Sequence, residues 1–233
     1  QYAVAFADFA AERGLAYVMF TSGSTGDPKG VQIGRESVTL FAGWIRDCLN
    51  LGPAPAFMDQ MLFSFDFSLF NWVGALELGG ACVLCPRETI AQRDTFVRYL
   101  ADNRINVWAS TPSFVRQQLF NPDFDQAHLP LLRVFVFGAE SLTPTLAEEL
   151  WRRFPAVRII NSYGPTEATC STTWVEIDAA LRGDRVRARR EHLGDAGRAQ
   201  ALLGHAERGA QPGAAGADDH DVELVVDIGI GGT

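Results

Sequence analysis

The sequence predicts an α/β domain in which helices pack on a largely parallel sheet. Strand-like and helix-like segments alternate through the first three quarters of the chain, as in domains of this class. The composition, 47% hydrophobic and 21% charged, is that of a globular protein with a full core. The longest apolar stretches, such as Gly79 to Leu84, are far shorter than the ~20 residues of a membrane helix. No membrane span is therefore expected.

Five short apolar runs are predicted to be strands, and the segments between them include the predicted helices. The strands are Leu15–Thr21, Ala81–Cys85, Val107–Ser110, Val134–Phe137 and Arg158–Asn161. The helices are Ser37–Leu49, Thr95–Asn103 and Leu142–Phe154. The last of these has the clearest pattern, because it opens at Thr143-Pro144 and spaces its apolar residues four apart.

From about residue 179 the chain changes character. Aromatic Phe, Tyr and Trp residues stop at Trp174, and Arg182–Gly216 is a mixture rich in Arg, Ala and Gly. We interpret 1–178 as a partial core and 179–233 as an atypical tail, either disordered or translated from a shifted reading frame. The start at Gln1 and the end at Thr233 indicate a fragment.

Charge and cysteine content narrow the possible partners and compartment. A formal net charge of −8 argues against a nucleic-acid binder, and the acidic residues among the tail arginines favour a solvated face there. The four cysteines do not form a disulfide framework, so a reducing cytoplasm is expected. Cys82 and Cys85 would lie on opposite faces of a strand, which favours core thiols over a metal or redox pair. His128 lies in a polar loop and suggests no catalytic role.

The strongest local signal is the segment from Tyr17 to Val31, in which an apolar strand, expected to be buried, leads into a loop of hydroxyls and glycines. Small residues there let backbone N–H groups and hydroxyls surround phosphate oxygens. Lys29 is the only lysine in the sequence and ends this loop. A Walker loop is excluded because Pro28 precedes the lysine and Gly30 follows it. The alternative is an ordinary Gly/Ser-rich surface turn.

A second motif, Asn161 to Glu167, follows a predicted strand, where open α/β sheets bind their ligands. Its tyrosine offers a ring face for a purine, and its glutamate offers the oxygen that Mg²⁺ prefers.

Two further segments indicate a substrate site. Asp66 is the one carboxylate in the apolar run from Leu62 to Val73, and burying it costs several kcal/mol unless a partner neutralises it. Alternatively, Asp66 caps a helix that begins at about Ser68, and both roles can coexist. The turn Gly138-Ala139-Glu140 ends a strand with small residues that leave room for a ligand, or simply forms a tight turn.

The loop from Thr21 to Gly30 resembles the signature loop of the adenylate-forming, or AMP-binding, superfamily, and Asn161 to Glu167 resembles its second nucleotide motif. The resemblance implies the large N-terminal domain of that fold, with ATP and Mg²⁺ as cofactors. It gives catalytic roles to Lys29, Thr166 and Glu167, the last as the magnesium ligand. The residues implied to bind the nucleotide are Thr21, Ser22, Gly23, Ser24, Thr25, Gly26, Lys29, Asn161, Ser162, Tyr163, Gly164 and Thr166.

Phe65-Asp66-Phe67-Ser68 resembles the amino-acid adenylation domains, in which the matching Asp receives the substrate's α-ammonium group. Within these, the D-alanyl carrier protein ligases are the most similar, which implies a small amino acid, D-alanine first, and an acyl or peptidyl carrier protein as partner. Gly138, Ala139 and Glu140 would complete the substrate site. That family typically has Cys at the position of Gly138, so looser discrimination between D- and L-amino acids is expected. The superfamily's ribose-binding motif, hinge and small C-terminal domain are absent, which predicts a poorly active fragment. Acyl-CoA synthetase chemistry and a non-catalytic nucleotide-binding fragment are the alternatives.

Overall fold

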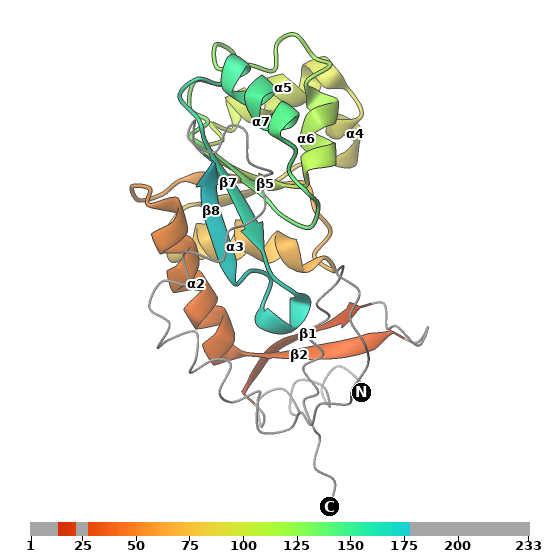
Figure 1. Ribbon diagram of the computed structural model, residues 1–233, viewed down its shortest axis with the longest axis vertical. Helices are drawn as coiled ribbons and strands as arrows, with labels where there is room; N and C mark the ends of the chain where they lie inside the picture. The colour runs from red at the N-terminus through yellow and green to blue at the C-terminus, as the bar shows by residue number, and fades with distance from the viewer. Residues whose placement is uncertain (1–13, 22–27, 178–233) are drawn as a thin grey trace, which may run out of the picture. The chain divides into compact units, whose positions relative to one another are not determined.

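The computed structural model describes residues 14–21 and 28–177 (Figure 1). The predicted tail, 179–233, and the centre of the phosphate loop, 22–27, lie outside these ranges. The described chain forms a two-stranded antiparallel sheet from β1 (Leu15–Thr21) and β2 (Lys29–Gly34), and a six-stranded sheet.

The six-stranded sheet has the order β4-β3-β5-β6-β7-β8. Its strands are β3 (Ala56–Asp59), β4 (Ala81–Leu84), β5 (Val107–Ser110), β6 (Val134–Phe137), β7 (Arg158–Tyr163) and β8 (Thr173–Ile177). All neighbours pair in parallel except β8, which runs antiparallel to β7. The predicted largely parallel sheet is therefore confirmed. Because β4 and β5 flank β3, the strand order reverses at β3, and open α/β sheets bind ligands beside such a point.

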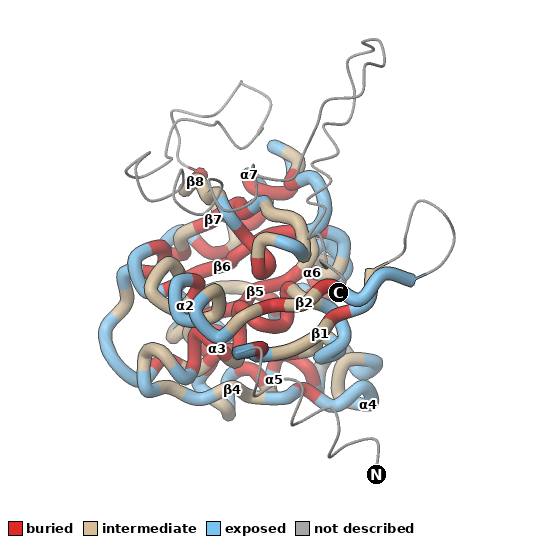
Figure 2. The backbone as a smooth tube through the Cα atoms, turned by 90° about the horizontal axis from the view of Figure 1, so that it is seen from below, coloured by how far each residue is buried: buried red, intermediate tan, exposed pale blue. Residues whose placement is uncertain are grey.

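Helices cover both faces of this sheet. On one face lie α2 (Arg35–Leu49) and α3 (Leu69–Glu77), and on the other lie α4 (Arg87–Ile90), α5 (Arg93–Asp102), α6 (Pro112–Gln118) and α7 (Pro144–Arg153) (Figure 1). Strand side chains alternate between the faces, so Trp108 packs toward α5–α7 while Val107 packs toward α2 and α3. The central strands β5, β6 and β7 are accordingly almost wholly buried (Figure 2).

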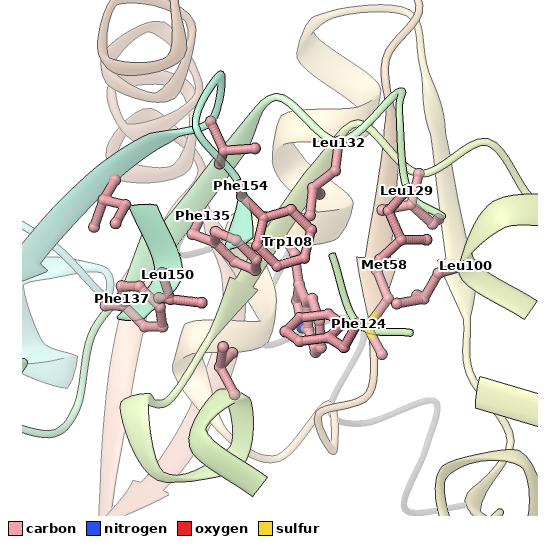
Figure 3. Close-up of a cluster of buried hydrophobic side chains, with 14 of the residues drawn as sticks. Met58, Leu100, Trp108, Phe124, Leu129, Leu132, Phe135, Phe137, Leu150 and Phe154 are labelled. Carbon is pink, nitrogen blue, oxygen red and sulfur yellow. The ribbon is translucent and has the colours of Figure 1, made fainter. Parts of the chain in front are cut away.

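Aromatic rings fill the core on the α5–α7 face (Figure 3). The Trp108 ring lies 5.6 Å from Phe124 and 5.7 Å from Phe135 between centroids. Its indole N–H donates to Gln60 Oε1 at 3.1 Å, and Gln60 Nε2 donates to Ser110 Oγ at 2.8 Å. This core therefore fixes the loop that follows β3, which leads into the candidate site.

The predicted elements agree with the structure in position and differ in extent. β5 and β6 have the predicted bounds, while β7 continues two residues further, to Tyr163. Thr143 caps α7 as predicted, because its hydroxyl oxygen accepts from Leu146 N–H at 3.3 Å. Strands β2, β3 and β8 were not predicted from the sequence. Strand β1 was predicted to be buried, but Phe20 is 69% exposed, because a two-stranded sheet packs on one face only.

Cys82 and Cys85 lie on opposite faces of the sheet, as predicted for a strand. Cys82 packs toward α2 and α3, whereas Cys85 is buried on the α5–α7 side. Both thiols are free, and burial raises the pKa of each to about 11. They are therefore core thiols, protonated at neutral pH. Among the described residues, no helix combines the length and the apolar character that a membrane crossing requires.

Candidate functional site

A hydrogen bond joins two of the predicted motifs, which lie a hundred positions apart in the sequence. Asp66 begins the 3-10 turn η1 (Asp66–Ser68) after β3, and Thr166 begins the 3-10 turn η2 (Thr166–Ala168) after β7. The Thr166 hydroxyl donates to the Asp66 carboxylate. The carboxylate predicted to receive the substrate's ammonium group and the hydroxyl predicted to face the α-phosphate are therefore in direct contact.

The surroundings of Asp66 differ from the prediction in two respects. The side chain does not cap α3, whose N-cap is Ser68 without a side-chain hydrogen bond. Asp66 is also only half-buried, and Leu62 and Phe63 of the apolar run are each 59% exposed. Desolvation of Asp66 is therefore weaker than the sequence predicted, and the Thr166 hydroxyl already partners its carboxylate.

The first three residues of the second motif, 161–163, lie on β7 itself, and the rest follow the strand. Ser162 is buried, and its hydroxyl donates to the Phe137 carbonyl at 3.0 Å, so this side chain links β7 to the end of β6. Asn161 is also buried, whereas the Tyr163 side chain is 64% exposed. Of these three residues, Tyr163 presents the open ring that a purine could stack on.

The backbone around the second motif is tightly folded. A Cβ on Gly164 would lie 2.5 Å from Ser171 Cα and 2.7 Å from Thr172 N, so only glycine allows this approach. Thr169 and Cys170 have φ angles of 67° and 100°, in the region that side chains rarely adopt. Such outliers gather where the surrounding structure holds a site in place.

The turn after β6 contributes packing and a helix cap. Glu140 accepts from Ser113 N–H at 3.0 Å and from the Ser113 hydroxyl at 2.8 Å, so it holds the first turn of α6. Gly138 has no room for a side chain, because a Cβ there would lie 2.8 Å from two ring carbons of Phe67. Ala139 has a φ of 66°, a conformation that favours glycine.

Strands β1 and β2, which flank the predicted phosphate loop in the sequence, reach the same region. Thr21 pairs with Lys29 at the end of the hairpin, β2 contacts η2, and the Lys29 side chain is exposed. The other predicted loop residues, Ser22, Gly23, Ser24, Thr25 and Gly26, lie outside the described residues. Burial raises the pKa of Tyr17 on β1, and Cys170 and Asp66 raise it further. The Tyr17 hydroxyl is buried and has no hydrogen-bond partner within the described ranges.

Asp59 is a buried carboxylate that sequence reasoning missed. It ends β3, is 2% exposed, and accepts from Met61 N–H at 3.0 Å and from Asn71 Nδ2 at 3.2 Å. Burial raises its pKa, and these two hydrogen bonds offset part of that effect. The signal was a carboxylate directly after the apolar Phe57-Met58, which recognition of β3 would have placed at the carboxyl edge of the sheet.

Glu167 completes the region as an exposed carboxylate on η2, and no ion pair involves it in the part of the chain that the structure describes. Tyr163 ends β7 at the carboxyl edge of the sheet, and Asp66 and Thr166 follow β3 and β7 at the same edge. The fold and this arrangement together define an α/β protein of the class that binds its ligand at the carboxyl ends of parallel strands.

Comparison with known proteins identifies the family. The AMP-binding enzyme family matches residues 6–201, and the chain belongs to this family. It is 42% identical over 161 residues to the D-alanine–D-alanyl carrier protein ligase of Bacillus velezensis (strain DSM 23117 / BGSC 10A6 / LMG 26770 / FZB42), covering 69% of this chain and 32% of that protein. The chain thus spans about a third of the length of the curated relatives it matches.

Solved structures agree with this membership. The nonribosomal peptide synthetase FmoA3 in its AMPPNP-bound form matches with a TM-score of 0.63 and 27% identity, over 71% of this chain and 18% of that chain. The Vibrio cholerae adenylation domain AlmE, in complex with glycyl-adenosine-5'-phosphate, matches with a TM-score of 0.61 and 26% identity, over 71% of this chain and 31% of that chain. The fold is therefore that of the adenylation domains.

Proposed function

We propose that the protein uses ATP and Mg²⁺ to activate a small amino acid as its aminoacyl-AMP, for transfer to the phosphopantetheine thiol of a carrier protein. The observation that carries this proposal is the contact between Asp66 and Thr166. A carboxylate that receives an α-ammonium group there would hold the amino acid's own carboxylate beside the hydroxyl that faces the α-phosphate. D-alanine ranks first among substrates, because relatives 39–42% identical are named for it.

In the reaction, a carboxylate oxygen of the amino acid attacks the α-phosphorus, and the bond to pyrophosphate breaks with its electron pair on the leaving group. Asp66 orients the amino acid through its ammonium group, which supplies the proximity that such a step needs. When the substrates bind, the Thr166 hydroxyl turns its single proton from Asp66 to an α-phosphate oxygen, and the substrate's ammonium group takes its place on the carboxylate. Lys29 offsets the charge on the β- and γ-phosphates, and Ser22 and Thr25 of the loop donate hydrogen bonds to them.

The residues fit the nucleotide and the metal. The exposed ring of Tyr163 offers a stacking face to adenine, with buried Asn161 beside it on the same strand. Mg²⁺ is usually held by one or two carboxylates together with substrate phosphates, so Glu167 alone is a sufficient protein ligand. When bound, the metal neutralises phosphate charge.

The partner, compartment and activity of the chain by itself follow from the same reasoning. A chain that spans a third of its relatives is expected to turn over slowly alone, because charge stabilisation at phosphorus needs groups from the remainder. A carrier protein is the proposed acceptor, since the relatives are named as carrier protein ligases. All four cysteines are free, which supports a reducing cytoplasm.

The test is ATP–pyrophosphate exchange with the intact protein, meaning this chain with whatever else its gene encodes. D- and L-amino acids, fatty acids and aryl acids are compared in the parent, Asp66→Asn and, as the matched control, Asp102→Asn at the exposed end of α5. Amino-acid-dependent exchange that falls about a hundredfold or more in Asp66→Asn alone is expected. A preference for fatty or aryl acids would instead indicate acyl-CoA synthetase chemistry, and no exchange at all would indicate a nucleotide-binding relic.

A companion measurement addresses Glu167. ATP affinity is measured with and without Mg²⁺ in the parent and in Glu167→Gln. The magnesium-dependent part of the affinity should shrink in the variant, while metal-free binding stays the same. Equal dependence on Mg²⁺ in both proteins would remove Glu167 from the metal site.

A further inference from the structure

Next to the candidate site, the Phe67 ring fills the space that a side chain at position 138 would take. Gly138 follows β6 and is buried, and an added Cβ would approach Phe67 Cε2 and Cζ to 2.8 Å each and Ser162 Oγ to 3.2 Å. Contacts this short do not occur in folded proteins, so the ring can hold its position only because residue 138 has no side chain. The Phe67 side chain is correspondingly 3% exposed.

The Phe67 ring is fixed from its other sides as well. It lies 6.0 Å from the Phe70 ring and 6.5 Å from the Phe65 ring between centroids, within the apolar cluster on the α2–α3 face. Close-packed interiors transmit displacements instead of absorbing them. A larger residue at position 138 would therefore push the ring and, with it, the three-residue turn η1 that carries it.

Asp66 directly precedes Phe67 in that turn, and its carboxylate receives the Thr166 hydroxyl. The same added Cβ would also approach Ser162, whose hydroxyl donates to the Phe137 carbonyl at 3.0 Å and which belongs to β7, the strand that leads to Thr166. Gly138 is thus packed between the two segments that supply the partners of the Asp66–Thr166 bond.

We propose that Phe67 and Gly138 form a complementary pair of positioning residues that sets the Asp66 carboxylate where it recognises the substrate's ammonium group. This inference rests on the proposed function. It concerns recognition of the amino group and is separate from the expected looser discrimination between D- and L-amino acids. The freed volume is filled by the Phe67 ring, so recognition of the amino group stays strict.

The readout is discrimination between alanine and propionate, which differ by the amino group that Asp66 would bind. ATP–pyrophosphate exchange in the intact protein gives kcat/KM for each acid. Gly138→Ala should lower the alanine-to-propionate ratio by about tenfold or more, because a misplacement of about 1 Å costs up to two orders of magnitude. The KM for ATP should stay the same. Phe67→Leu should lower the ratio as well, and the double variant should regain most of it.

Gly74→Ala is the matched control. A Cβ on Gly74 in α3 would lie 2.8 and 2.9 Å from two ring carbons of Phe57 and 3.2 Å from an Ile45 methyl, which is the same kind of clash within the core. It should reduce stability and leave the ratio unchanged. Equal changes in Gly74→Ala and Gly138→Ala would reduce the pair to ordinary packing and overturn the proposal.

Every outcome separates this inference from the proposed function. If the parent does not prefer alanine to propionate, the proposed function fails. If the parent does and Gly138→Ala keeps that preference, only the pair fails. If Gly138→Ala does not fold, the double variant provides the test. An alanine-to-propionate ratio in the double variant no higher than in Phe67→Leu alone would refute the complementarity of the pair.

Discussion

The glycine in the second nucleotide motif provides the sharpest test of the site's geometry. In Gly164→Ala, the new methyl would lie 2.5 Å from Ser171 Cα, 2.7 Å from Thr172 N and 2.8 Å from the Cys170 carbonyl oxygen. All three are backbone atoms, so no side-chain rotation relieves the contact. Overpacking of this kind costs about 1–3 kcal/mol, and occasionally more.

The same substitution at Gly43 serves as the control. Gly43 lies in the middle of α2, and its added Cβ would meet only Arg46 Nη2, at an ordinary 3.5 Å. Replacing a helical glycine by alanine gains about 1 kcal/mol. The two variants should therefore differ by about 2–4 kcal/mol in the free energy of unfolding, measured by urea denaturation. If Gly164→Ala unfolds within about 0.5 kcal/mol of the parent, the close approach at this turn does not exist.

Three further substitutions test particular features. Ala139→Gly should stabilise the chain by up to about 1 kcal/mol, because it relieves a φ of 66°, and a midpoint shifted to lower urea would contradict this strain. Burial raises the pKa of Asp59, so the contribution of this residue to folding stability is most favourable below the unfolded pKa near 3.8 and is lost as pH rises through the folded pKa. Asp59→Asn should therefore equal the parent in stability at acid pH and exceed it at pH 7. The reverse order would contradict a raised pKa. Tyr17→Phe removes a buried hydroxyl without a partner in the described ranges and should raise stability by about 1 kcal/mol or more, whereas a loss would reveal a partner for that hydroxyl.

The fold was largely predictable because its main elements have unambiguous local patterns. A short apolar run is sufficient by itself to predict each of the strands β5 and β6. The N-cap and the four-residue spacing of apolar residues are likewise sufficient to predict helix α7. Strands β3 and β8 were missed because each has only four or five residues and includes polar ones, a pattern that fits a loop equally well. Pairing also decided the hairpin, since β2 becomes a strand only through its register with β1.

Sequence motifs could name the residues of the candidate site, but they could not predict which contacts those residues make. The motifs named Asp66 and Thr166 separately, and only the three-dimensional structure brings their side chains into contact. Local sequence could not foretell that the fold uses Glu140 as a helix cap, because its partner Ser113 is distant in the chain. Likewise, the absence of a side chain at Gly138 reads as open space until the Phe67 ring is placed in it.

The central claim is that the amino acid's carboxylate attacks the α-phosphorus of ATP. Alanine labelled with ¹⁸O in its carboxylate is incubated with the intact protein, ATP and hydroxylamine as the acceptor. Attack at the α-phosphorus, followed by cleavage of the carbonyl carbon–oxygen bond, leaves one ¹⁸O atom in AMP, and this is the predicted result. Label recovered in inorganic phosphate, with ADP as the nucleotide product, would show attack at the γ-phosphorus and contradict the account.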